Sequence, residues 1–253
     1  MDRPPAVDYD AVAPTYDERY DRNRYDGVRE TVRRFVDRRA APFPDVAEVG
    51  CGTGHWLAEI RDLAGLRAGV DRSWGMLGAA RSAAPDALLV RASAERLPWH
   101  SASFDRVLCI NALHHFPDAA AFVAEAGRVL RPGGGLLTIG LDPHVGQDRW
   151  WIYDYFPSAL HADLERYAAT HAIRALLGDA GFSYITTGVA QHMPASVPFH
   201  IALERGQLDR RSTSQLMVIS DADYEAGMQR LSDEKPILRA DLRLYATVGW
   251  MAA

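Results

Sequence analysis

A glycine-rich turn between a short strand and a helix constrains this fold more than any other feature of the sequence. The turn is the run Glu48-Val49-Gly50-Cys51-Gly52-Thr53-Gly54. Residues 46–49 predict a short strand that runs straight into the glycines, and residues 55–63 resume helical spacing. Glycine lets the backbone approach a ligand closely, and the next helix presents free amides at its positive end. The run therefore predicts a ligand-binding turn after the first strand of an α/β fold.

The alternation of strand and helix continues along the chain. Further strands are predicted at residues 66–70, 87–91, 104–110, 135–140, 184–189 and 242–250. Further helices are predicted at residues 26–40, 74–83, 119–130 and 159–180. Repeated strand–helix units imply a parallel sheet with right-handed crossover connections. The fold class is therefore α/β.

Two segments interrupt this alternation. Residues 141–158 are irregular and rich in aromatic side chains, and residues 190–241 separate the last two predicted strands. The second segment is too long for an ordinary loop and contains a predicted helix at residues 214–231. We expect both segments to be cap regions of a single domain spanning residues 1–253, because one hydrophobic core can still support a chain of this length.

Composition narrows the range of partners. The formal charge is -5 and the basic residues do not gather in one run, so nucleic acid is not an expected partner. No apolar run approaches the roughly 20 residues that cross a bilayer, and residues 1–10 lack the features of a signal peptide. We therefore expect a cytoplasmic protein that does not enter membranes. The 2 cysteines are too few for a disulfide scaffold or a zinc site, and no metal is expected. The oligomeric state stays open.

The glycine turn departs from the dinucleotide fingerprint, because the position of the third glycine is His55. Its GxGxG pattern after an acidic residue resembles the first motif of class I S-adenosylmethionine (SAM)-dependent methyltransferases, in particular the type 11 small-molecule group that includes quinone-biosynthesis methyltransferases. The resemblance implies a Rossmann-like, seven-stranded sheet of order 3214576 with an antiparallel last strand. It also implies that the turn wraps the methionine portion of SAM and that the acidic residue acts near its amino group. By this resemblance the cofactor-binding residues of the turn are Glu48, Gly50, Cys51, Gly52 and Gly54.

Asp71 ends the second predicted strand, where a carboxylate can accept hydrogen bonds from both ribose hydroxyls. The alternative is that Asp71 caps the next helix. In combination with the first motif, ribose binding is the favoured interpretation. Arg72 and Met76 are further candidate cofactor residues, and Met76 could instead belong to the core.

The segment after the third strand reads Ala92-Ser93-Ala94-Glu95-Arg96-Leu97-Pro98-Trp99. It resembles the Asp-Ala-Glu-x-Leu-Pro-Phe segment that lies beside the adenine in this family. Ser93 stands where that pattern usually has Asp, so the contact to the adenine amine differs here. Ser93, Ala94 and Glu95 are the candidate cofactor residues of this segment.

The exit of the fourth strand reads Asn111-Ala112-Leu113-His114-His115-Phe116 and resembles the segment that borders the methyl-transfer site in this family. Ligands in open α/β sheets gather at the carboxyl ends of strands, which makes Asn111 a candidate for both cofactor binding and catalysis. His115 and His114 are candidate general bases, because neutral histidine has a pKa close to working pH. Alternation turns only one of them toward the ligand, and the other can bind backbone.

The N-terminal run Tyr9-Asp10-Ala11-Val12-Ala13-Pro14-Thr15-Tyr16-Asp17 is similar to the Tyr-Asp segments that fold over the cofactor in the same group. We therefore expect residues 1–40 to cover the cofactor. Tyr16 either closes the site or packs on the first helix.

The aromatic stretch and the long excursion are expected to surround the methyl acceptor, which favours a flat or apolar substrate. The candidate acceptor residues are His144, Trp150, Trp151 and Tyr153, and His144 is the third candidate base. Aromatic side chains at such spacing more often pack in a core than recognise a substrate.

The predicted function is SAM-dependent transfer of a methyl group to a small, apolar or aromatic metabolite by in-line displacement, with S-adenosylhomocysteine as product. One alternative is a SAM-fold protein without methyl transfer, such as a cyclase or a binding partner. Another is an NAD(P)-dependent oxidoreductase, which His55 disfavours. A nucleic-acid methyltransferase is disfavoured because the fourth-strand exit lacks the Asn/Asp-Pro-Pro-aromatic motif that holds an extruded base.

Overall fold

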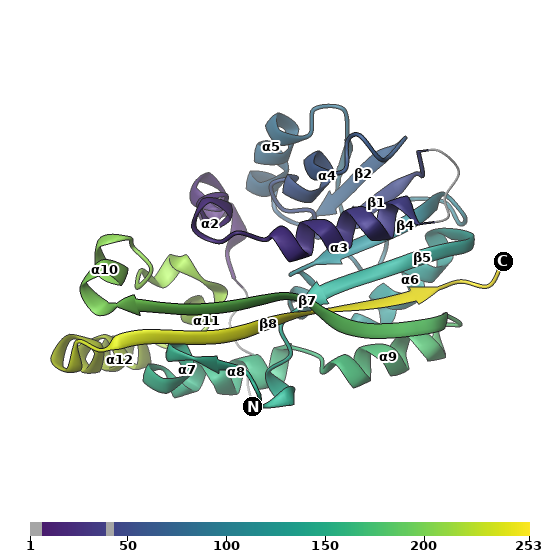
Figure 1. The fold of residues 1–253 in the computed structure, drawn as a ribbon. Helices are drawn as coiled ribbons and strands as arrows, with labels where there is room; N and C mark the ends of the chain where they lie inside the picture. Colours follow the sequence, from purple (N-terminus) through teal and green to yellow (C-terminus); the bar gives the residue numbers. More distant parts are fainter. Residues whose placement is uncertain (1–6, 39–42) are drawn as a thin grey trace. The chain divides into compact units, whose positions relative to one another are not determined.

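The computed structural model describes residues 7–38 and 43–253, and the chain divides into two compact units (Figure 1). The first, called the sheet unit, comprises Tyr9–Gly140, Thr170–Gln191 and Leu244–Ala253. The second, called the insertion unit, comprises residues 7–8, Leu141–Ala169 and His192–Arg243. The two expected cap regions lie in the insertion unit, except for residues 190–191. That residues 1–253 form one domain stays a prediction.

The sheet has the predicted order of strands. It runs β3 (Leu88–Arg91), β2 (Arg67–Asp71), β1 (Val46–Val49), β4 (Phe104–Ile110), β5 (Leu130–Gly140) and β8 (Ile237–Trp250), with β7 (Ser183–Pro198) paired to β8. The pairs among β1 to β5 are parallel, and β8 is antiparallel to β5. Because β7 and β8 are the sixth and seventh predicted strands, the order 3214576 and the α/β class are confirmed.

The sheet unit contains helices before, between and after its strands. They are α1 (Tyr9–Val12), η1 (Ala13–Thr15), α2 (Glu18–Arg22), α3 (Asp26–Asp37), α4 (His55–Glu59), α5 (Trp74–Ala83), η2 (Leu113–His115), α6 (Ala119–Val129) and α9 (Thr170–Asp179). In Figure 1, α3 crosses in front of the strands and α6 lies behind them. Residues 39–40 of the predicted helix 26–40, and residues 1–6 of the predicted covering segment, lie outside the described residues.

Burial explains why these segments form strands and helices. All of β1 is buried, and β4 is buried except at Asp105. Apolar side chains are required on both faces of a strand that helices cover on both sides. In α3 the buried side chains recur at helical spacing, namely Val28, Val32, Phe35 and Val36.

The helix predicted at residues 159–180 is wrong as a single helix. It is two helices, α8 (Pro157–Arg166) and α9, separated by residues 167–169. The buried side chains of α8 belong to the insertion unit, whereas those of α9 belong to the sheet unit. The apolar face continues along the sequence, but the core that it joins changes, so the helix breaks at the boundary.

Other predicted boundaries also change. The strands predicted at 184–189 and 242–250 are longer, because β7 and β8 pair with each other and this pairing leaves little local signal. β5 begins at residue 130 rather than 135, and α4 ends at residue 59 rather than 63. The helix predicted at 214–231 is two helices, α11 (Ser214–Met217) and α12 (Asp221–Glu234), because the side chain of Ser220 caps α12.

The insertion unit has its own core. Its elements are η3 (Pro143–Val145), β6 (Arg149–Trp150), α7 (Trp151–Tyr155), α8, α10 (Phe199–Glu204), η4 (Arg210–Ser212), α11 and α12, together with the adjoining parts of β7 and β8. Buried apolar residues from these elements form one cluster, which includes Ile152, Phe156 and Leu216. Among the described helices, none has the length and apolar content needed to span a membrane.

Candidate cofactor site

The glycine turn has the backbone conformation that its sequence predicts. Gly50 and Gly52 have φ angles of 73° and 51°, which side chains rarely allow. A Cβ on Gly50 would lie 2.5 Å from the Cβ of Ala112, so the fourth-strand exit approaches the turn directly. A Cβ on Gly52 would meet nothing closer than Cε1 of Tyr16 at 3.9 Å. The Tyr16 ring therefore lies next to the turn at Gly52, at the distance of an ordinary van der Waals contact with a Cβ there.

Glu48 lies directly before the turn and is 1% exposed. Its carboxylate accepts a hydrogen bond from the backbone amide of Leu57, but its Oε2 atom is buried and has no hydrogen-bond partner among the described residues. Burial, reinforced by the nearby Asp71 carboxylate, raises the pKa of Glu48 well above its usual value. A buried carboxylate oxygen without a partner is costly, and a ligand cation would satisfy it.

Asp71 ends β2 and faces the same turn. One carboxylate oxygen accepts a hydrogen bond from the amide of Gly52 and the other from the amide of Ser73, both at 2.9 Å. Burial raises the pKa of Asp71. Ser73, and not Asp71, is the N-cap of α5, because Ser73 Oγ accepts from the amide of Met76 at 3.0 Å. Each oxygen of Asp71 keeps capacity for a further hydrogen bond, as two ribose hydroxyls would require.

The other residues predicted at the second and third strand ends lie close to Asp71. Asp71 pairs with Arg91 across β2 and β3, which places Ser93 and Ala94 just beyond the end of the neighbouring strand. The hydroxyl of Ser93 donates to the carboxylate of Glu95, and Ala94 is buried.

Two residues next to Asp71 have different surroundings. Met76 is 1% exposed, as its alternative assignment to the core requires. Arg72 is exposed, and its carbonyl accepts from Arg91.

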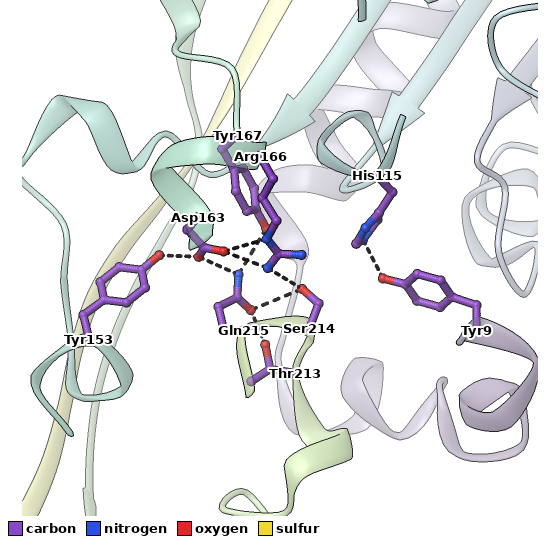
Figure 2. Close-up of polar contacts among 9 residues, drawn as sticks. All are labelled: Tyr9, His115, Tyr153, Asp163, Arg166, Tyr167, Thr213, Ser214 and Gln215. Carbon is purple, nitrogen blue, oxygen red and sulfur yellow. Dashed lines mark hydrogen bonds and ion pairs between the residues drawn. The ribbon is translucent and has the colours of Figure 1, made fainter. Parts of the chain in front are cut away.

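The fourth-strand exit brings Asn111 and the two histidines to the turn. Asn111 has a φ angle of 51°, a conformation that is strained for a residue other than glycine and is common at functional sites. The Tyr9 hydroxyl lies 2.5 Å from Nε2 of His115 (Figure 2). The rings of His114 and His115 are 3.9 Å apart between centroids. Tyr9 therefore holds one of the two candidate bases.

An N-terminal arm, residues 9–22, contacts the turn and the start of α5. The carboxylate of Asp10 accepts from the hydroxyl of Ser73 at 2.6 Å and from the amide of Gly75 at 2.7 Å. The first of these bonds, helped by the second, lowers the pKa of Asp10. The Tyr9 ring contacts the Tyr16 ring edge-on at 6.0 Å.

Further contacts join the arm to the turn itself. The Thr53 hydroxyl donates to Asp17, and the Tyr20 ring stacks on His55 at 3.6 Å with 4° between the ring planes. Sequence reasoning singled out only Tyr16 in this arm. The quoted Tyr-Asp run contained Tyr9, Asp10 and Asp17, but their partners are not visible from spacing.

The four candidate acceptor residues lie in the insertion unit. His144 Nε2 is 2.8 Å from the carbonyl of Tyr167, and Trp150 and Trp151 pack against the apolar cluster of that unit. Figure 2 shows the Tyr153 hydroxyl donating to Asp163 at 2.7 Å, which raises the pKa of Tyr153 after the larger effect of burial. The polar atoms of His144 and Tyr153 thus have internal partners.

Comparison with known proteins identifies the family. Residues 47–138 match the family described as Methyltransferase domain. Demethylmenaquinone methyltransferase of Renibacterium salmoninarum is 33% identical over 164 residues, which cover 64% of this chain and 69% of that protein. The chain belongs to the class I SAM-dependent methyltransferases.

The chain is also similar to 27-O-demethylrifamycin SV methyltransferase of Amycolatopsis mediterranei, with 31% identity over 180 residues, 62% of each chain. It spans 62%, 47% and 61% of the length of three curated relatives that it matches. Among solved structures, the [4+2]-cyclase SpnF is similar to this chain. The structural alignment covers 100% of each chain, with a TM-score of 0.62 and 17% sequence identity. That likeness concerns the fold alone.

SAM is the cofactor of this methyltransferase family, and the site's residues fit it. The unpartnered oxygen of Glu48 suits an ammonium group, and Asp71 has capacity for two hydroxyls. Within the described part of the chain, no group of three or more His, Cys, Asp or Glu side chains is arranged to hold a metal ion.

Proposed function

We propose that this protein transfers a methyl group from SAM to a small, apolar or aromatic metabolite in the cytoplasm. The observation that carries the proposal is a pair of neighbouring carboxylates at the glycine turn, Glu48, which is buried, and Asp71, which is half-buried. An ammonium group and a vicinal diol are the ligand groups that satisfy such a pair. The net charge of -5 disfavours nucleic acid as the acceptor.

When bound, SAM supplies an electrophilic methyl group on a sulfonium, so the protein's part is alignment and exclusion of water. Alignment of two reactants can lower such a barrier by roughly 7–11 kcal/mol in favourable cases. Glu48 would hold the methionine end of the cofactor and Asp71 its ribose, and Tyr16 would cover the turn from the N-terminal arm. Ser93, Ala94 and Glu95 would frame the adenine.

His115 is the proposed general base when the acceptor is a hydroxyl or a carbon acid. The Tyr9 hydroxyl contacts Nε2 of His115 and so restrains the orientation of the ring. The His114 ring lies beside it with 48° between the ring planes, and the strained backbone at Asn111 sets the direction in which the chain leaves β4. Asn111 is proposed to contact the cofactor there.

The proposed acceptor residues are His144, Trp150, Trp151 and Tyr153. Because the polar atoms of His144 and Tyr153 already have internal partners, these side chains would offer the acceptor apolar ring surface. Such lining suits a flat metabolite.

Two experiments test the proposal. Titration calorimetry should show binding of SAM and S-adenosylhomocysteine and no binding of NAD. Mass spectrometry should then detect S-adenosylhomocysteine and a methylated product, with demethylmenaquinone and 27-O-demethylrifamycin SV as the first acceptors offered. SAM binding without turnover of any acceptor in a broad panel would favour the alternative without methyl transfer. NAD binding in place of SAM would reject the proposal.

A further inference from the structure

Arg166, at the end of α8 in the insertion unit, is a buried cation that does not use all of its donors. Its side chain is 10% exposed. Nε and Nη2 contact one oxygen of Asp163 at 2.8 and 2.7 Å, and Nη2 also donates to Ser214 Oγ at 3.0 Å (Figure 2). The third nitrogen, Nη1, has no partner among the described residues. Because Nη1 is not one of the fully buried, unpartnered atoms of the described chain, it reaches solvent.

A second buried arginine shows how such a side chain is satisfied when its role is structural. Arg106, in β4, is 3% exposed. Its Nε, Nη1 and Nη2 donate to the backbone carbonyls of Phe35, Asp105 and Arg38, respectively. Such complete pairing is the rule for buried polar groups. Arg166 differs, since the two N–H groups of its Nη1 are left to water or to a ligand.

The residues around Arg166 hold its guanidinium in one orientation. Asp163 is fully buried, and its carboxylate also accepts from the Tyr153 hydroxyl at 2.7 Å and from Gln215 Nε2 at 2.9 Å. Because Nε and Nη2 both face this carboxylate, Nη1 points away from it (Figure 2). A donor whose orientation is fixed in advance loses little conformational freedom when it binds a ligand.

Two of the four proposed acceptor residues belong to the same neighbourhood. Tyr153 shares the Asp163 carboxylate with Arg166, and His144 Nε2 lies 2.8 Å from the carbonyl of Tyr167, the residue after Arg166. These contacts use the Tyr153 hydroxyl and His144 Nε2, so the two side chains offer mainly ring surface. Arg166 can supply the polar contact that the two rings do not.

We propose that Nη1 of Arg166 donates a hydrogen bond to a carbonyl oxygen of the methyl acceptor. The inference rests on the proposed function and narrows its substrate class to flat or apolar metabolites that carry a carbonyl group. Asp163 already balances the charge of the guanidinium, so a ligand carboxylate would add an unbalanced charge beside a buried pair. A carbonyl oxygen is neutral and has two lone pairs and no hydrogen, so it accepts without needing a partner of its own.

The test compares two probes that differ by one oxygen. 1-Tetralone carries a carbonyl next to an aromatic ring, and tetralin has the same fused rings without the oxygen. Dissociation constants are measured by ligand-observed NMR on the protein saturated with S-adenosylhomocysteine. The variant is Arg166→Lys, because lysine keeps a charge for Asp163 but its single nitrogen cannot also take the place of Nη1. The matched control is Arg205→Lys, since Arg205 is an exposed arginine of the same unit.

We expect Arg166→Lys to weaken binding of 1-tetralone by roughly 10-fold or more, the effect of losing a hydrogen bond from a charged donor. Binding of tetralin should change by less than about 2-fold, because tetralin cannot accept that bond. Arg205→Lys should match the wild-type protein with both probes. The affinity for S-adenosylhomocysteine should be the same in all three proteins, which shows that the variants are folded.

An unchanged affinity of Arg166→Lys for 1-tetralone, or equal losses for the two probes, would overturn the role of Arg166. A wild-type protein that binds S-adenosylhomocysteine but neither probe would also overturn it, and the proposed function would stand in each of these cases. A wild-type protein that does not bind S-adenosylhomocysteine would overturn the proposed function and this inference with it. If Arg166→Lys does not fold, Asp163→Asn and Arg166→Met made together remove both charges and decide by the same comparison.

Discussion

The hydroxyl of Tyr9 lies 2.5 Å from Nε2 of His115, although the two residues are separated by 106 positions in the chain. The contact joins the N-terminal arm to the exit of the fourth strand. It gives the arm a role in orienting a candidate base, in addition to covering the glycine turn.

The Tyr9 and His115 pair can be tested by its effect on turnover. His115→Asn should lower kcat by roughly 100-fold or more, because a general base contributes that much, and Tyr9→Phe should cause a smaller loss and alter the pH profile of kcat. Steady-state kinetics across pH measures both effects. The control is Tyr184→Phe, since Tyr184 is 85% exposed. An unchanged kcat in His115→Asn would remove His115 from the mechanism.

The ribose role of Asp71 predicts a selective loss of affinity. Asp71→Ala should weaken SAM binding by about 1.5–3 kcal/mol, because a charged hydrogen-bonding partner is lost. Titration calorimetry measures the change, with exposed Asp179→Asn as the control. Equal SAM affinity in Asp71→Ala and the wild-type protein would reject the role.

The raised pKa of Glu48 predicts that the stability of the protein without ligand depends on pH. Its pKa in the folded state is raised well above the usual 4.5, so the folded state retains a proton that the unfolded state releases. This contribution to stability is complete below pH 4.5 and is lost as the pH rises toward the folded-state pKa. Thermal unfolding between about pH 5 and pH 8 should therefore show wild-type stability falling relative to Glu48→Gln. Parallel curves for the two proteins would contradict the prediction.

Substitution of Gly50 by alanine is expected to reduce stability for two reasons that can be measured separately. Gly50→Ala introduces a side chain at a φ of 73° and places its Cβ 2.5 Å from that of Ala112. Gly146→Ala has similar strain, with a φ of 70°, but its Cβ meets no described atom within 4 Å. Denaturant titration should show a loss of about 1 kcal/mol for Gly146→Ala and about 1–3 kcal/mol more for Gly50→Ala. Equal losses would mean that the approach of Ala112 to the turn relaxes without cost.

Removal of the Asp163 carboxylate is expected to lower the free energy of unfolding, because it breaks a buried hydrogen-bond network. Its side chain is fully buried and is bonded to Tyr153, Gln215 and Arg166 (Figure 2). Asp163→Ala should cost roughly 3–5 kcal/mol of unfolding free energy, because it leaves a buried guanidinium without its counter-ion. Urea unfolding tests this against exposed Asp233→Ala, for which a change below about 0.5 kcal/mol is expected. A small loss in Asp163→Ala would show that water replaces the carboxylate.

The sequence by itself determined the α/β class, the order of the sheet and the family. The α/β class follows from local signals, namely the alternation of apolar strands with amphipathic helices. The family follows from the resemblance that the glycine turn and the later motifs carry, and the order of the sheet is what that resemblance implies. It also determined that Asp71 ends a strand and that Glu48 is the residue before a strand end. Parallel pairing then brings those ends to one edge of the sheet, so the two carboxylates converge on the turn.

Only the tertiary structure decided which distant side chains meet. The Tyr9 contact with His115 and the stacking of Tyr20 on His55 depend on how the N-terminal arm folds back, and residue spacing carries no signal for such contacts. The break between α8 and α9 and the lengths of β7 and β8 depend on which core or strand each segment joins. A periodic apolar pattern predicts that one face of an element will be buried, but it does not identify the element against which that face packs.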